Sequence, residues 1–259
     1  MKVSFSSPVC FLLIAAAASL LSCEGPSLSL SLMSRKERLF WAIEFNKVDE
    51  VRSLLGKRPD LVNASDGVAT PLLAAVTYRR AEIAKLLLEK GADPNLQGLE
   101  QGFTPLFAAV PIGEVDAALG ASWDPYDMVK ILLDSGADVH ARFMWGTSIL
   151  HTVVKAAPTS TRTIELLIER GAEVDARNDI GATPLSWAAS GGRVEAVRFL
   201  LEKGTDPTVK DRDGATIREQ LERGPRSANT DQILELLGQY EERRKPDNPE
   251  ALADERGSR

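Results

Sequence analysis

Amphipathic stretches recur along the chain, and a glycine follows each of them. Their apolar residues lie three and four positions apart, which is the spacing of one buried helix face. The stretches are Ile83 to Glu89, Val129 to Asp134, Ile164 to Glu169 and Val197 to Glu202. The glycines that follow are Gly91, Gly136, Gly171 and Gly204. Because glycine accepts the left-handed conformation that ends a helix, the pattern predicts repeated helices with fixed ends.

A second marker precedes each of these stretches. The tripeptide Thr-Pro-Leu begins at Thr70, Thr104 and Thr183, and related sequences begin at Ser148 and Thr216. In chain order, these five starting positions are 34, 44, 35 and 33 residues apart. Threonine caps the first N–H groups of a helix, and proline is tolerated in the first turn. A unit of about 33 residues that holds two helices buries its apolar face only against its neighbours.

This repeat resembles the ankyrin repeat over roughly residues 35–240. The resemblance implies an all-α solenoid of about six helix-turn-helix units with β-hairpin fingers between them. The first unit begins at Arg35 and lacks Thr-Pro-Leu. The last unit, which ends near Tyr240, has Ile217-Arg218 in place of proline-leucine, so we interpret both as capping units. Residues 241–259 are charged and contain proline, which predicts a flexible tail.

One unit carries a long insertion. The capping threonine and the closing glycine are 21 residues apart from Thr183 to Gly204, but 32 apart from Thr104 to Gly136. The 11 extra residues fall between the two helices, at about residues 111–125. With its flanks the insertion has no lysine or arginine, and it contains Glu114, Asp116, Trp123, Asp124, Tyr126 and Asp127. Either this acidic loop binds a basic partner surface, or its aromatic residues fold back onto neighbouring helices.

One hairpin tip is apolar where its counterparts are polar. Residues 178–180 and 211–213 are Asn-Asp-Ile and Asp-Arg-Asp, whereas the aligned residues of a third hairpin are Phe143, Met144 and Trp145. Large apolar side chains on a projecting hairpin are costly to expose to water, and aromatic residues and methionine are enriched at protein interfaces. We therefore predict that this finger binds a protein; the alternative is that it packs on the insertion.

Trp187 is a third candidate for binding. Other units have Ala74, Ala108 or Thr152 at its position, which faces the concave groove in ankyrin proteins. Its ring either fills a gap in the stack or contacts a ligand. His151 occupies the usual ankyrin histidine position, which implies a bond to loop backbone, and His140 is predicted to be a turn residue.

The N-terminus predicts a secreted lipoprotein. After Lys2, the apolar run Val9 to Leu21 has 13 residues, fewer than the roughly 20 needed to span a membrane, so it fits a signal peptide. Leu20-Leu21-Ser22-Cys23 resembles a bacterial lipobox, which implies a signal peptide at residues 1–22, a lipidated (palmitate-bearing) Cys23 and a tether at 23–34. The alternatives are a plain signal peptide with a chance cysteine, or a buried hydrophobic helix.

The same segment sets the expected location. The resemblance implies the bacterial cell envelope, with the protein facing the periplasm, and Glu24 in place of aspartate favours the outer membrane. Met33 is either an ordinary linker residue or an internal start, which would give a minor cytosolic form.

Composition excludes several classes of function. The 259 residues carry a net charge of −6, with two histidines and two cysteines. An acidic chain has no basic face for nucleic acid, and these few histidines and cysteines do not make a metal centre. The sequence has no glycine-rich phosphate loop, GxSxG or HExxH motif. We therefore predict no enzyme activity, no cofactor or metal, and no small-molecule substrate.

The two resemblances together suggest a function. Lipoproteins built of ankyrin repeats resemble immunity proteins that neutralise phospholipase toxins of type VI secretion systems. This implies a membrane-anchored protein-binding module whose partner is a phospholipase effector. The alternative is an envelope scaffold or chaperone-like factor that supports another periplasmic protein, such as an oxidative-stress enzyme.

Overall fold

The computed structural model describes residues 33–98, 102–110, 124–156 and 160–243. In these residues the helices form six successive pairs: α2 (Arg35–Glu44) with α3 (Val48–Lys57), α4 (Pro71–Thr77) with α5 (Ala81–Glu89), α6 (Pro105–Ala108) with α8 (Tyr126–Asp134), α9 (Ile149–Lys155) with α10 (Thr161–Glu169), α11 (Pro184–Ser190) with α12 (Val194–Glu202), and α13 (Ile217–Arg223) with α14 (Ala228–Arg243). A 3-10 helix, η1 (Pro59–Asn63), follows α3, and the strands β1 (Arg142–Phe143) and β2 (Thr147–Ser148) precede α9. The predicted all-α solenoid is confirmed.

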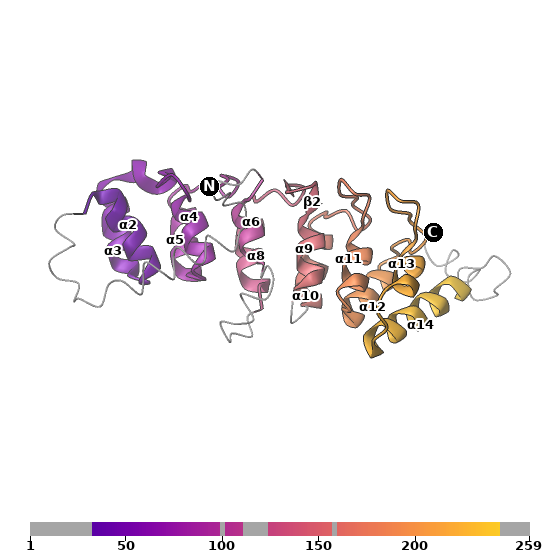
Figure 1. Ribbon diagram of the computed structural model, residues 1–259. Helices are drawn as coiled ribbons and strands as arrows, with labels where there is room; N and C mark the ends of the chain where they lie inside the picture. Colours follow the sequence, from indigo (N-terminus) through magenta and orange to yellow (C-terminus); the bar gives the residue numbers. More distant parts are fainter. Residues whose placement is uncertain (1–32, 99–101, 111–123, 157–159, 244–259) are drawn as a thin grey trace, which may run out of the picture.

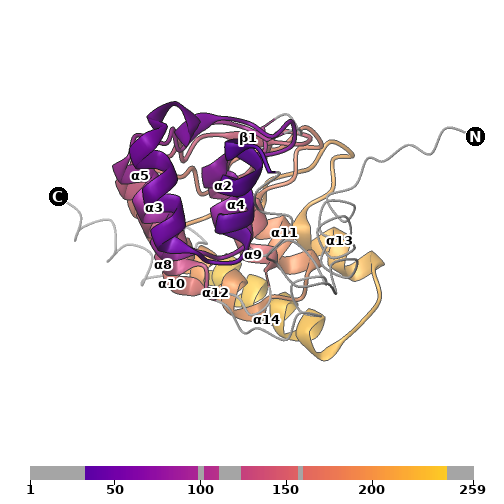
Figure 2. The same cartoon turned by 90° about the vertical axis from the view of Figure 1, so that its left-hand side faces the viewer.

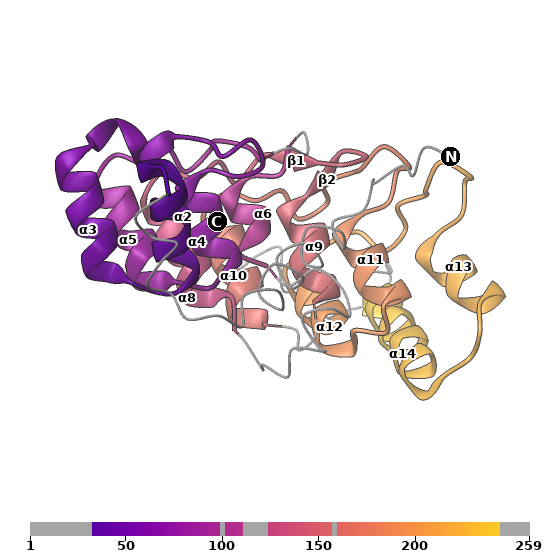
Figure 3. The same cartoon turned by 60° about the vertical axis from the view of Figure 1, so that its left-hand side comes forward.

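The pairs stand side by side in a row (Figure 1). First helices contact first helices, as α9 contacts α11 and α11 contacts α13, and second helices contact second helices, as α10 contacts α12. The molecule therefore has two helical layers. The hairpins lie along one edge of the row, and the end-on view shows them extending beyond the α2–α4 layer (Figure 2). The oblique view follows the same edge from β1 and β2 to α13 (Figure 3).

The Thr-Pro-Leu marker begins the first helices as predicted. The side chains of Thr70, Thr183 and Thr216 accept hydrogen bonds from the backbone N–H three residues later. The leucine of the marker enters the core, and the four equivalent leucines are at most 1% exposed: Leu72, Leu106, Leu150 and Leu185. Helices of seven residues are marginal alone, so packing between units stabilises them.

The second helices end at the predicted glycines. Gly91 and Gly204 have φ of +90° and +86°, a conformation that side-chain-bearing residues resist. The next residue then turns back, as the Ala92 N–H donates to the Leu87 carbonyl at 2.9 Å. The last helix, α14, continues to Arg243, beyond the predicted end of the domain at residue 240.

The ends of the chain and the insertion lie mostly outside the described residues. Helix α2 begins at a capping box in which the Ser34 hydroxyl accepts from the Glu37 N–H and the Glu37 carboxylate accepts from the Ser34 N–H at 2.7 Å. None of the described helices combines the length and the apolar character needed to cross a membrane. Residues 111–123, which form most of the predicted insertion between α6 and α8, are not described.

Candidate protein-binding surface

The fingers are closed by an acidic or amide side chain in two of the last three units. We name residues 142–148 finger 4, residues 177–182 finger 5 and residues 210–215 finger 6. In finger 5 the Asn178 side-chain carbonyl accepts from the Ile180 and Ala182 N–H groups at 3.2 and 2.9 Å. In finger 6 the Asp211 carboxylate accepts from Asp213 and Ala215, both at 2.9 Å.

Finger 4 has Phe143 at the equivalent position and is built differently. Strands β1 and β2 pair antiparallel, with Phe143 opposite Thr147. The Phe143 ring lies 5.2 Å from the Phe103 ring and 5.6 Å from the Phe107 ring, measured between centroids, and the side chain is only 9% exposed. The prediction that Phe143 projects to a partner is therefore wrong, because strand pairing turns it into the core between finger 4 and α6.

Trp145 is the exposed aromatic residue of this finger. Its side chain is 68% exposed, and its φ of +56° is followed by +69° at Gly146. Two successive positive φ values are typical of a type I′ turn, which favours asparagine and glycine rather than a bulky residue. The Thr147 N–H closes the turn on the Met144 carbonyl at 3.3 Å. Met144 itself is half-buried and packs against the core.

Neighbouring finger tips are joined by backbone hydrogen bonds. The Asp179 N–H donates to the Trp145 carbonyl at 2.8 Å, and the Arg212 N–H donates to the Ile180 carbonyl at 3.1 Å. Trp145 and Ile180 therefore occupy the same place on adjacent fingers, and Ile180 is 56% exposed. The two side chains give the finger edge an apolar character.

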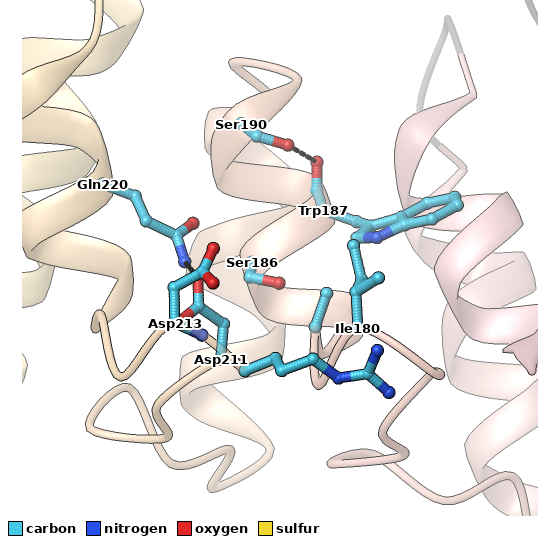
Figure 4. A pocket seen from close by; sticks show the side chains of 9 residues that line it. Ile180, Ser186, Trp187, Ser190, Asp211, Asp213 and Gln220 are labelled. Atoms are coloured by element: carbon cyan, nitrogen blue, oxygen red, sulfur yellow. Dashed lines mark hydrogen bonds between the residues drawn. The ribbon is translucent and has the colours of Figure 1, made fainter. Parts of the chain in front are cut away.

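A hollow of about 350 Å³ lies between fingers 5 and 6 and helices α11 and α13. Ile180 and Trp187 lie near one another on one side of it, and Asp211, Asp213 and Gln220 lie on the other side (Figure 4). We number each unit by its finger, so that unit 4 includes α9 and α10 and unit 5 includes α11 and α12. We call Trp145, Ile180 and Trp187 the apolar surface of units 4 and 5. Two of these residues, Ile180 and Trp187, line this hollow, and its opposite side is polar.

Trp187 both packs within the stack and lines the hollow. Its ring meets the His151 ring edge-on at 5.3 Å between centroids and 81°, and the Lys155 Nζ lies 5.3 Å from its centroid. Trp187 remains half-buried beside the hollow. The position thus combines the two roles that the sequence left open: it fills the stack, and it is accessible to a ligand.

His151 has the loop-binding position expected of it. Its Nε2 lies 3.0 Å from the Ala182 carbonyl, and its Nδ1 lies 2.7 Å from the Ser148 hydroxyl and 3.3 Å from the Ser148 N–H that donates to it. A neutral ring with the proton on Nε2 satisfies these partners. Burial is the main cause that lowers the pKa of His151 to about 4. The exposed His140 lies in a turn, where its N–H donates to Asp138 at 2.8 Å.

The described end of the insertion is tied to its own fold. The Asp124 carboxylate accepts from the Tyr126 N–H at 3.0 Å and from the Ser160 hydroxyl at 2.8 Å. The Arg162 guanidinium lies 4.2 Å from the Tyr126 ring centroid, and Tyr126 packs against the core. Asp124 and Tyr126 therefore join α8 to α10 rather than face a partner. Glu114, Asp116, Trp123 and the lipidation candidate Cys23 lie outside the described residues.

The sequence missed Ile180 and the hollow beside it. Ile180 shares its tripeptide with the polar residues Asn178 and Asp179, although it aligns with Trp145. This alignment was the available signal. The carboxylate wall was not predictable, because Asp211 and Asp213 reach the hollow only through the stacking of finger 6 on finger 5. No cluster of histidine, cysteine, aspartate and glutamate suited to a metal ion occurs within the described part of the chain.

Comparison with known proteins identifies the family. A family model described as "Ankyrin repeats (3 copies)" matches residues 39–142 and 117–211, which is more than half of the chain. The chain belongs to the ankyrin-repeat family. It is similar to human neurogenic locus notch homolog protein 1, with 35% identity over 142 residues, and to the same protein of Xenopus laevis, with 32% identity over 162 residues. It is also similar to E3 ubiquitin-protein ligase KEG of Arabidopsis thaliana, with 26% identity over 188 residues.

These relatives share only the repeat region with this ankyrin-repeat protein. The matches cover 54%, 62% and 68% of this chain, but only 5%, 6% and 11% of the human, Xenopus and Arabidopsis relatives. The ankyrin repeat is generally a non-catalytic scaffold that binds other proteins, and the similarity to a ligase lies in its repeats. The chain is accordingly a protein–protein interaction module.

Proposed function

We propose that this ankyrin-repeat protein is a lipid-anchored immunity protein that binds a secreted phospholipase toxin in the periplasm and neutralises it. The observation that carries the proposal is Trp145, an exposed tryptophan held at φ +56° on a hairpin tip. Bulky residues rarely adopt this conformation, and strain of about 1–3 kcal/mol persists mainly at functional sites. A residue that contributes so little to the fold is best explained by what it binds.

The position of Trp145 supports recognition of a protein. Its finger is hydrogen-bonded to the finger that carries Ile180, and Trp187, in the helix that follows that finger, lines the hollow together with Ile180. Exposed aromatic and aliphatic residues grouped in this way act as anchors, and truncation of such an anchor commonly costs about 2 kcal/mol or more of binding free energy. A binder that covers the mouth of an active site needs no catalytic residues of its own.

The N-terminal sequence supports a place in the envelope. The apolar run that ends in Leu20-Leu21-Ser22-Cys23 is that of a lipoprotein signal, and the repeats that follow contain no cysteine. A body without thiols suits an oxidising compartment, and several acyl chains on one residue give lasting membrane attachment. The choice of a phospholipase as partner rests on the resemblance between ankyrin lipoproteins and type VI immunity proteins.

An inhibition assay tests this proposal. If a lipase-fold protein is encoded beside this gene, it is the toxin to test, and its hydrolysis of phospholipid vesicles is measured with increasing amounts of the full chain. We expect stoichiometric loss of hydrolysis. Undiminished hydrolysis at a large molar excess would overturn the immunity function. Co-purification with an envelope enzyme whose activity is preserved would favour a scaffold instead.

A further inference from the structure

The hollow between fingers 5 and 6 presents an apolar wall and an acidic wall to the same space. Ile180 and Trp187 form the first, and Asp211 and Asp213 belong to the second (Figure 4). Its volume of about 350 Å³ lies at the small end of the roughly 300–1,000 Å³ that ligand pockets occupy. It therefore has room for one long side chain rather than for a helix.

The two carboxylates differ in how they are engaged. Asp211 accepts three hydrogen bonds, from the Asp213 and Ala215 N–H groups and from the Gln220 amide at 2.7 Å, so it holds finger 6 to α13. Asp213 is exposed, and within the described residues no hydrogen bond or ion pair engages its carboxylate. The acidic wall thus has one carboxylate that is committed to the fold and one that is available.

We propose that this hollow binds a lysine or arginine side chain from an extended segment of the partner. The inference rests on the proposed function of protein binding and names the chemistry of the contact. The aliphatic stem of such a side chain packs along Ile180 and Trp187, and its charged head pairs with Asp213. Arg212 also lines the hollow, but two carboxylates against one guanidinium leave a net negative charge, which favours a cation.

Peptide titration of the full chain tests the proposal. Three acetylated, amidated pentapeptides, Gly-Gly-X-Gly-Gly with lysine, norleucine or glutamate at X, are followed by the NMR signals of the tryptophan indoles. At about 10 mM peptide, binding is detectable even if its free energy is only about 3 kcal/mol. We expect the lysine peptide to bind about two- to fivefold tighter than the norleucine peptide, because an ion pair with the exposed Asp213 carboxylate adds to the apolar contact that both peptides make. The glutamate peptide should not bind.

Two variants locate the contact. Asp213→Asn should weaken binding of the lysine peptide until it equals that of the norleucine peptide, and Ile180→Ala, which keeps the Trp187 indole as the reporter, should weaken binding of both peptides. Glu89→Gln removes the same charge from an exposed site at the end of α5 and should bind like wild type. Circular dichroism confirms that each variant is folded.

Each remaining outcome overturns the proposal. These are no signal change with the lysine peptide, equal binding of lysine and norleucine, preference for glutamate, or an Asp213→Asn variant that binds like wild type. The titration is independent of the toxin assay. If only the peptide titration fails, the proposed immunity function is unaffected. If only the toxin inhibition assay fails, the hollow is still a pocket for a basic side chain.

Discussion

Phe143 and Trp145 are two positions apart, yet one is buried and the other is exposed. The sequence identified this tripeptide as unusual, because its apolar residues replace the polar residues of other fingers. It did not separate their roles, because the direction of each side chain depends on the register of β1 and β2. That register places Phe143 against Phe103 and Phe107 and leaves Trp145 at the turn.

Stability measurements should separate the two residues. Phe143→Ala removes a buried ring and should lower the free energy of unfolding by about 3 kcal/mol or more. Trp145→Ala removes an exposed ring and should change it by less than about 0.5 kcal/mol. Urea unfolding followed by circular dichroism gives both values. A strongly destabilised Trp145→Ala variant would show that this ring supports the fold.

His151 predicts a specific response to acid. Its folded pKa of about 4 lies below the ordinary 6.5, so the unfolded chain takes up the proton first and stability falls as the pH drops from 6.5 toward 4. At pH 5 this loss is about 2 kcal/mol, while most carboxylates are still ionised. Urea midpoints at pH 7 and pH 5 should differ in wild type and in His140→Gln, and should differ much less in His151→Gln. Equal differences in all three would exclude His151 as the cause.

At the scale of elements, the helix ends were predictable and the finger geometry was not. Thr-Pro-Leu and the closing glycines set the helix limits through local capping, which short sequence patterns record. Finger 4 departs from its neighbours because Phe143 replaces the side-chain acceptor that Asn178 and Asp211 provide. The resulting pair of positive φ values at Trp145 and Gly146 depends on the whole hairpin, which no single residue signals.

Glycine substitutions test the strain in finger 4. Trp145→Gly should leave stability unchanged or raise it by up to about 1 kcal/mol, because glycine adopts the left-handed conformation without the steric cost. Ile180→Gly is the matched control at the equivalent tip, where φ is not positive, and should lose about 0.5–1 kcal/mol. Thermal unfolding of wild type and the two variants measures these changes in stability. If Trp145→Gly loses as much stability as Ile180→Gly, the backbone of Trp145 is not strained.

At the scale of the whole molecule, the repeat period predicted the solenoid because each unit must bury its face against the next. The period also placed an insertion between α6 and α8, although most of it lies outside the described residues. The hollow was not predictable in this way, because it arises where finger 6 stacks on finger 5. The proposed anchor is a property of the N-terminal sequence alone, independent of the solenoid.

Membrane partition tests the anchor. Wild-type protein should sediment with membranes, and Cys23→Ala should move to the soluble fraction or accumulate uncleaved, because Cys23 is the proposed site of lipid attachment. Cys10→Ala is the matched control and should partition like wild type. A Cys23→Ala variant that is cleaved and still sediments with membranes would exclude lipidation at this site.

Calorimetric titration of the full chain into the purified phospholipase measures whether units 4 and 5 bind the proposed toxin through Trp145. The control is Phe45→Ala, which removes another exposed aromatic residue, 49% exposed, at the end of α2. We expect Trp145→Ala to weaken binding by about 30-fold or more, the equivalent of about 2 kcal/mol, and Phe45→Ala to bind like wild type. Equal affinities for wild type and Trp145→Ala would exclude Trp145 as an anchor of the complex.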